Sequence, residues 1–389
     1  MPISMLTADF VMASGSRDVT RSDAAFRAYQ NTTYFKSLDI LRAFSIIAVV
    51  WHHTALELFA HPLAKQGYHG VTLFFAISGF LIVTLILREK ERTGQFAIKA
   101  FYIKRTLRIF PLYYATLLSY VALVYFVEKN AGARAAFIEN LPYFATFTIN
   151  WVASADSHRI IFYFAWSLAA EEQFYLFWPW IERYTRGLVT LGIAVALVAI
   201  TPDFLSPLAG DAAGQIVPLN VFARFPAAIG LGVVLAHLLH NPATFRWVAA
   251  IAGQRGSVLS IFVMVVATLC SGTSLGVWER PVLDALMCLL VAACVVRPDN
   301  DFAVLNKLRP LVWVGVVSYG MYLLHMLAVN AVKQTDAAFG GVIEPLAGAQ
   351  APLLLFVGST LFAALMATLS YLTYERWFLG LKDRLIRRA

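Results

Sequence analysis

The sequence predicts an all-α polytopic membrane protein with about ten transmembrane helices and with both termini cytoplasmic. Hydrophobic residues make up 59% of the 389 residues and charged residues only 14%, and the mean hydropathy is +0.68. The apolar residues form long unbroken runs close to the ~20 residues that cross a bilayer as a helix. A soluble core would instead show amphipathic stripes or strict alternation. The runs therefore indicate a membrane-embedded helical bundle.

Ten apolar runs are candidate transmembrane helices. In chain order they cover residues 38–56, 70–87, 109–127, 162–181, 187–201, 216–238, 257–275, 281–296, 311–330 and 351–374. We expect a polar N-terminal tail at 1–35, one transmembrane domain at 36–375 and a basic cytoplasmic C-terminal tail at 376–389. The apolar patch 141–152 is too short to cross, and we expect it to be re-entrant or to lie in the membrane interface.

The distribution of charge predicts membrane orientation rather than a nucleic-acid partner. The net charge is +8, but the basic residues lie in short segments between the apolar runs. Most of the 31 Lys and Arg residues fall in segments that are cytoplasmic when both termini are inside, which is the positive-inside pattern. The 3 cysteines lie within apolar runs, so no disulfide framework is predicted. No metal-ligand spacing is present, and no metal is expected.

The first span carries ionisable residues within its apolar run. Asp39 and Arg42 are three residues apart and therefore share a helix face. Arg42 and His53 are eleven apart, or about three turns, so they lie on one stripe, whereas His52 points away from it. Ionisable groups inside a span are expensive and mark functional sites by default. The alternative is that the histidines only mark the membrane–water boundary.

Small and basic residues mark the second and third spans. Ser78 and Gly79 favour close helix approach, and we prefer this structural interpretation to a nucleophilic serine. Arg105 and Arg108 share a face at the cytoplasmic end of the third span, where two arginines could bind phosphates. The alternative is an ordinary positive-inside anchor, which we prefer for Lys104.

The fourth span begins with two adjacent acids, Glu171 and Glu172. A carboxylate there could orient a histidine or hold a sugar hydroxyl, and Glu171 also shares a face with Tyr175. The alternative is a solvated helix start, where acids favour the macrodipole. We favour a functional role for Glu171 and leave Glu172 open.

The sixth and ninth spans also contain polar candidates. Ser318, Tyr322 and His325 lie on one face in the middle of the ninth span. The alternative for His325 is a structural histidine satisfied by its tyrosine neighbour. Arg224, inside the sixth span, needs a partner or a water-filled cavity.

Five motifs, taken in order, resemble the acyltransferase-3 family of integral membrane O-acyltransferases. The resemblance covers LDILRA (38–43) followed by His53, GVTLFFAISGFLI (70–82), RTLRIFPLYY (105–114), WSLAAEEQFYLFWP (166–179) and SYGMYLLH (318–325). Members are similar in having about ten spans and in moving acetyl or other short acyl groups from cytoplasmic acyl-CoA to hydroxyls of glycans or lipid-linked sugars. The chain departs from the family at Ile40, where glycine is usual, and after Glu375, where proline often follows.

The resemblance implies a role for individual residues. Arg42 and His53 stand where the family keeps its essential arginine and its catalytic histidine. Arg105 and Arg108 match the motif thought to hold the CoA phosphates, and Glu171 matches the motif glutamate. We also assign Tyr322 and His325, from the last motif, to the donor site; Asp39 joins the catalytic group as the partner of Arg42.

We therefore expect an O-acyltransferase in a bacterial cytoplasmic (inner) membrane, with O-acetyl transfer as its activity. His53 would act as general base on the acceptor hydroxyl, while Asp39 and Arg42, or Glu171, orient it or balance charge. The expected donor is acetyl-CoA or another short acyl-CoA, and the expected partners are a glycan or lipid-linked sugar and membrane lipids. The alternative is a secondary transporter of a sugar or small molecule, against which no internal inverted repeat is visible.

Overall fold

All regular structure in the described part of the chain is helical. The computed structural model describes residues 23–55, 63, 66–152, 160–209, 225–341, 348 and 351–386. Residues 23–31 form a short helix. The named elements that follow are α2 (Lys36–Ala55), η1 (Gly67–His69), α4 (Gly70–Thr93), α5 (Ile98–Phe126), α6 (Ala131–Ala145), α7 (Ile149–Val152), η3 (Tyr163–Ala165), α8 (Trp166–Tyr184), α9 (Leu188–Ala199), α10 (Pro202–Ala209), α12 (Ala227–His240), α13 (Pro242–Ala252), α14 (Ser257–Ser271), η6 (Gly272–Trp278), α15 (Glu279–Val296), η7 (Asp301–Lys307), α16 (Arg309–Val316), α17 (Ser318–Ala338), α19 (Ala351–Ser370), η9 (Tyr371–Glu375) and α20 (Arg376–Ile386).

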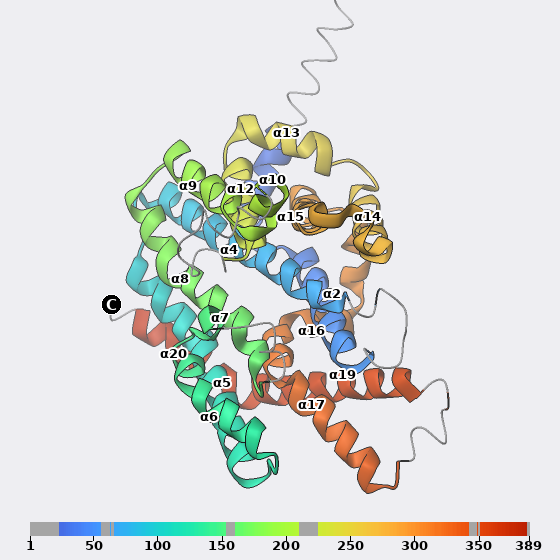
Figure 1. Cartoon of the computed structure of the whole chain (residues 1–389). Helices are drawn as coiled ribbons and strands as arrows, with labels where there is room; N and C mark the ends of the chain where they lie inside the picture. The colour runs from blue at the N-terminus through green and yellow to red at the C-terminus, as the bar shows by residue number, and fades with distance from the viewer. Residues whose placement is uncertain are drawn as a thin grey trace, which may run out of the picture.

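The helix α2 lies near the middle of the molecule, and the other helices pack around it (Figure 1). It contacts α4, α15, α16, α17 and α19. Its apolar side chains, such as Ile40, Leu41 and Ile46, are fully buried. The first predicted span thus forms a central helix, and its ionisable residues are carried into the bundle.

Several helices are long and apolar enough to cross a membrane. Among the described residues, three pass on their own: Gly67–Thr93, Ile98–Phe126 and Ala351–Ile386. Three bent pairs pass together: α12 with α13 (114°), Leu275–Val296 with η7 (72°), and α16 with α17 (84°). The predicted spans 38–56 and 162–181 overlap α2 and α8, which are not among these candidates. The predicted count of ten spans stays a prediction.

The predicted span 311–330 is sharply bent in the structure. An 84° bend at Val317 separates α16 from α17. A Cβ on Gly315 would lie 2.0 Å from the carbonyl oxygen of Asp39, so α16 rests directly on the backbone of α2. Beyond the bend, α17 packs mainly against α19 and keeps a smaller contact with α2. The bend therefore divides the predicted span into two helices with different main packing partners. Ser318 is the first residue of the second helix.

The apolar patch 141–152 folds back along α5. The hydroxyls of Tyr113 and Tyr114 donate to the carbonyls of Phe144 (2.8 Å) and Ala145 (2.9 Å), and both tyrosines lie in the middle of α5. Phe147 then turns the chain with a φ of 54° and stacks on Tyr113, with ring centroids 4.2 Å apart. The patch therefore packs against the middle of α5, and the expectation that it is re-entrant or lies in the membrane interface stays a prediction.

The two predicted tails are partly packed. Tyr29 is buried and contacts the rings of Phe35 and Phe245, while Arg88 donates to the carbonyls of Tyr29 (2.7 Å) and Thr32 (2.6 Å). Aromatic side chains thus anchor the end of the predicted polar tail. The C-terminal tail is helical as α20, which follows the π-helical turn η9 and packs against α5.

Glycines let α4 and α12 touch backbone to backbone. A Cβ on Gly79 would lie 2.1 Å from the carbonyl oxygen of Ile229, and one on Gly232 would lie 2.4 Å from that of Ala76. The expectation that Gly79 serves close helix approach is therefore confirmed. Its neighbour Ser78 instead donates to Glu171 in another helix.

We expect Gly79→Ala to lower the free energy of unfolding by about 1–3 kcal/mol, because overpacking here pushes two backbones apart. Gly192→Ala is the matched control, since an added Cβ there meets nothing within 4 Å and alanine favours a helix by up to about 1 kcal/mol. Thermal unfolding in detergent measures both. A Gly79→Ala variant that melts at or above the wild-type temperature would contradict the close contact.

Candidate functional site

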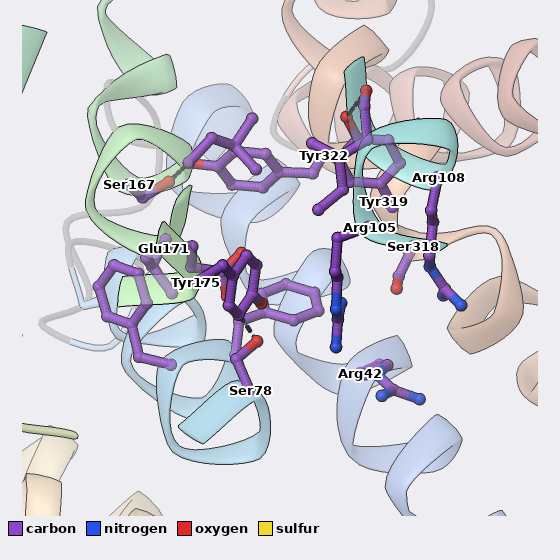
Figure 2. A pocket seen from close by; sticks show the side chains of 15 residues that line it. Arg42, Ser78, Arg105, Arg108, Ser167, Glu171, Tyr175, Ser318, Tyr319 and Tyr322 are labelled. Carbon is purple, nitrogen blue, oxygen red and sulfur yellow. Dashed lines mark hydrogen bonds between the residues drawn. The ribbon is translucent and has the colours of Figure 1, made fainter. Parts of the chain in front are cut away.

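A polar cavity lies between α2, α4, α5, α8 and α17 (Figure 2). Its volume is about 740 Å³, including the open space at its mouth. Polar side chains from all five helices line it: Arg42, Ser78, Arg105, Arg108, Ser167, Glu171, Tyr175, Ser318, Tyr319 and Tyr322. Such a concentration of polar groups inside an apolar bundle is expensive and marks a functional site.

A second cavity of about 1410 Å³ adjoins the first. Arg42, Ser78, Arg105, Arg108 and Tyr319 line both. The rest of its wall comes from residues 33–39, from the second half of α4, from α16 and the start of α17, and from η9 and Leu379. The three arginines therefore stand where the two cavities meet.

The arginines come from two helices and gather on one side of the central cavity, opposite Ser78 and Glu171 (Figure 2). Arg105 and Arg108 share a face of α5, as their spacing predicted, and the Cζ atom of Arg105 lies 4.6 Å from the centre of the Tyr175 ring. Among the described residues, no carboxylate oxygen lies within ion-pair distance of Arg105 or Arg108. Arg105 is half-buried and Arg108 is exposed, so two cations without a paired anion line the cavity wall and can bind an anionic ligand.

Asp39 supports Arg42. Its carboxylate is buried, accepts a hydrogen bond from Nη1 of Arg42 at 2.8 Å and accepts another from the hydroxyl of Tyr34. Burial and this bond to Asp39 raise the pKa of Tyr34, which lies before α2, to about 12. Tyr34 therefore stays protonated and donating. The predicted pairing of Asp39 with Arg42 is confirmed, and it orients Arg42 toward the cavity.

Glu171 lies in the central cavity opposite the arginines. It accepts a hydrogen bond from Oγ of Ser78 at 2.6 Å, and Tyr175 lies one turn further along the same face of α8. Glu172 lines a separate cavity beside Gln173. The structure thus gives Glu171 a serine partner, where a histidine partner was one of the expected roles.

Tyr322 lines the cavity from α17. Its hydroxyl donates to the carbonyl of Phe164 at 2.8 Å and lies 2.5 Å from Oγ of Ser167. His325 lies one turn beyond it in α17 and does not line the cavity. Tyr322 thus shares the cavity with the arginines, whereas His325 does not.

His53 and His325 meet beyond Tyr322. Their ring centroids are 5.0 Å apart, which joins the end of α2 to the middle of α17. His52 lies beside His53 but packs against Tyr68, with ring centroids 5.7 Å apart. His53 and His52 thus contact different neighbours, as their different directions on the helix predicted.

The sequence candidates fall into two groups. Arg42, Arg105, Arg108, Glu171 and Tyr322 line one cavity, with Asp39 behind Arg42, whereas His53 and His325 form a pair beyond it. Arg224 lies outside the described residues. No group of three or more His, Cys, Asp or Glu side chains in the described ranges could hold a metal ion.

Sequence reasoning missed four polar residues of the cavity wall. Ser78 was interpreted as structural, and Ser167, Tyr319 and the cavity position of Tyr175 were not assigned to the site. The i, i+4 spacing of Glu171 and Tyr175 was the one signal that pointed toward this wall. The other partners depend on which helices become neighbours.

Comparisons with known proteins give a family match and several curated relatives. Residues 35–374 match the model of a family described as an acyltransferase domain. A Staphylococcus aureus (strain COL) protein named as a candidate O-acetyltransferase is 28% identical over 334 residues, which cover 79% of this chain and 52% of that protein. The peptidoglycan O-acetyltransferase OatA of Listeria monocytogenes is 25% identical over 311 residues, covering 75% and 49%.

A Bacillus subtilis protein, YrhL, named as a candidate peptidoglycan O-acetyltransferase, is 24% identical over 325 residues, covering 76% of this chain and 49% of that protein. The chain spans about half the length of the curated relatives it matches. No solved structure matches it.

Proposed function

The chain belongs to the acyltransferase-3 family, and from that premise we propose that it is a membrane-embedded O-acetyltransferase. It would move an acetyl or other short acyl group from acyl-CoA to a hydroxyl of a cell-surface glycan or lipid-linked sugar. The family match and the relatives named for O-acetyl transfer support this activity. The family match also favours it over the transporter alternative.

The observation that carries the proposal is the arginine group at the junction of the two cavities. CoA bears phosphates, and a guanidinium binds phosphate through two parallel hydrogen bonds. Arg105 and Arg108 have no carboxylate partner among the described residues, while Arg42 is held in place by Asp39. In our proposal the wider cavity admits the nucleotide end of the donor, and the phosphates bind at these arginines.

The acyl end of the donor then points toward the histidines. The pantetheine arm would run along the central cavity past Glu171 and Tyr175 to Tyr322. Tyr322 is held by its hydrogen bonds to Ser167 and to the Phe164 carbonyl, and in our proposal its ring moves aside as the thioester approaches His53. The proposal thus keeps Tyr322 in the donor path.

His53 is the general base in this scheme. It takes the proton from the acceptor hydroxyl as the hydroxyl oxygen attacks the thioester carbonyl carbon. The carbon–sulfur bond then breaks, and the proton passes from the imidazolium to the CoA sulfur. His53 is half-buried, which leaves a side of its ring open to an acceptor.

The proposed topology places the donor and the acceptor on opposite sides. We propose ten spans with both termini inside a bacterial inner membrane, because most Lys and Arg residues then lie in cytoplasmic segments. The end of α4, the start of α5 and the whole of α20 are then cytoplasmic, and these segments surround the wider cavity. His53 lies near the outer end of α2, where a surface glycan could reach it.

Replacing either Arg105 or Arg108 with Ala should raise KM for acyl-CoA about 10- to 100-fold, because hydrogen bonds to charged groups contribute about 1.5–3 kcal/mol. Lysine should restore the affinity only in part, because it lacks the planar fork. Lys104→Ala is the control, since Lys104 lies outside both cavities that the arginines line. Equal KM values in all three alanine variants, measured by acyl transfer in membranes, would rule out the phosphate clamp.

His53→Ala should lower kcat by about 10²–10⁴-fold, the usual contribution of general base catalysis. His52→Ala should keep most of the activity, because His52 packs toward Tyr68. Acyl transfer is compared at matched protein levels in membranes. An inactive His52→Ala beside a fully active His53→Ala would show that the base is assigned to the wrong histidine.

A further inference from the structure

We propose that His325 is a positioning residue that fixes the tautomer and the orientation of His53. The proposal rests on the proposed function, in which His53 is the base. It replaces the donor-site role that the sequence motif suggested for His325, because His325 does not line the central cavity. Its argument comes from the hydrogen-bonding state of one buried imidazole.

The backbone sets the tautomer of His325. Its Nδ1 atom lies 2.6 Å from the carbonyl oxygen of Tyr322. A carbonyl oxygen only accepts hydrogen bonds, so Nδ1 must carry the proton. In the neutral ring Nε2 then carries a lone pair and can only accept.

That acceptor is buried and available. His325 is fully buried, and its Nε2 atom has no hydrogen-bond partner among the described residues. A buried acceptor without a donor is destabilising, so an unused one calls for a functional explanation.

His53 is the donor that the packing offers. Besides His53, the rings around His325 are Phe164 at 5.0 Å and Tyr322 at 5.6 Å. Phe164 has no polar side-chain atom, and the Tyr322 hydroxyl already bonds to Ser167 and to the Phe164 carbonyl. The His53 ring is 5.0 Å away and tilted by 42°, so a small rotation brings one of its N–H groups to Nε2. Catalytic hydrogen bonds are often long before substrate binds and tighten in the complex.

The hydrogen bond would prepare His53 for its reaction. When one ring nitrogen of His53 donates to His325, the other keeps its lone pair and faces the half-exposed side of the ring. The acceptor hydroxyl gives its proton to that second nitrogen. The positive charge that develops on His53 is then stabilised by the Nε2 lone pair of His325, as a carboxylate does in a catalytic triad.

Three substitutions separate positioning from packing. His325→Asn keeps an N–H near the Nδ1 position for the Tyr322 carbonyl but has no atom at the Nε2 position. His325→Gln offers an amide oxygen near the Nε2 position. His325→Phe fills the space and lacks both groups. Detergent size-exclusion profiles confirm that each variant is folded.

We expect His325→Gln to keep kcat within about 10-fold of wild type, whereas His325→Asn and His325→Phe lose about 10²-fold. KM for acyl-CoA should be unchanged in all three. A purely structural role predicts instead that Asn, which keeps the bond to Tyr322, is at least as active as Gln. That order, or a raised KM with normal kcat, would overturn the proposal.

A second measurement is independent of transfer activity. Diethyl pyrocarbonate acylates neutral imidazole nitrogen, and tandem mass spectrometry separates modified His53 from modified His52. The rate at His53 should fall in the Asn and Phe variants and stay near wild type in the Gln variant. An unchanged rate in all three would overturn the proposal. Full activity in His53→Ala, by contrast, would remove the proposed base and the pairing with it.

Discussion

The proposed donor site depends on three guanidinium groups that line cavities within an apolar helical bundle. Arg42, Arg105 and Arg108 meet where two cavities join, and only Arg42 has a carboxylate partner among the described residues. Arg42 and Arg105 are half-buried and Arg108 is exposed, and cations within an apolar bundle need water, a counter-ion or a charged ligand. The arrangement is therefore well suited to binding an anion, which fits a phosphate-bearing donor.

Packing contacts elsewhere in the bundle position Arg42 and the two histidines. Gly315 brings α16 onto the carbonyl of Asp39, so the residue that orients Arg42 sits at a backbone-to-backbone contact. The bend that follows turns α17 so that Tyr322 lines the cavity and His325 meets His53. One bent pair of helices thus contacts both the cavity that the arginines line and the proposed base. Because α17 reaches both the cavity and His53, a donor whose phosphates bind at the arginines could extend its thioester toward His53.

Local spacing predicted the parts of the site that lie on single helices. The i, i+3 pairs Asp39–Arg42 and Arg105–Arg108 are found as expected, because helix geometry alone determines them. The bond from Ser78 to Glu171 joins residues 93 positions apart and could not be predicted, because it depends on how α4 packs against α8. The bend at Val317 also escaped prediction, since no proline marks it and the packing of α16 on α2 that precedes it joins residues far apart in sequence.

The sidedness of donor use tests the central claim most directly. Sealed membrane vesicles are prepared in inverted and right-side-out orientations, and labelled acetyl-CoA is added to the outside of each. The account predicts labelled glycan or lipid only in inverted vesicles, whose cytoplasmic face is outward, and in both kinds after permeabilisation. Equal transfer by sealed right-side-out vesicles would contradict a donor site that opens at the cytoplasmic arginines.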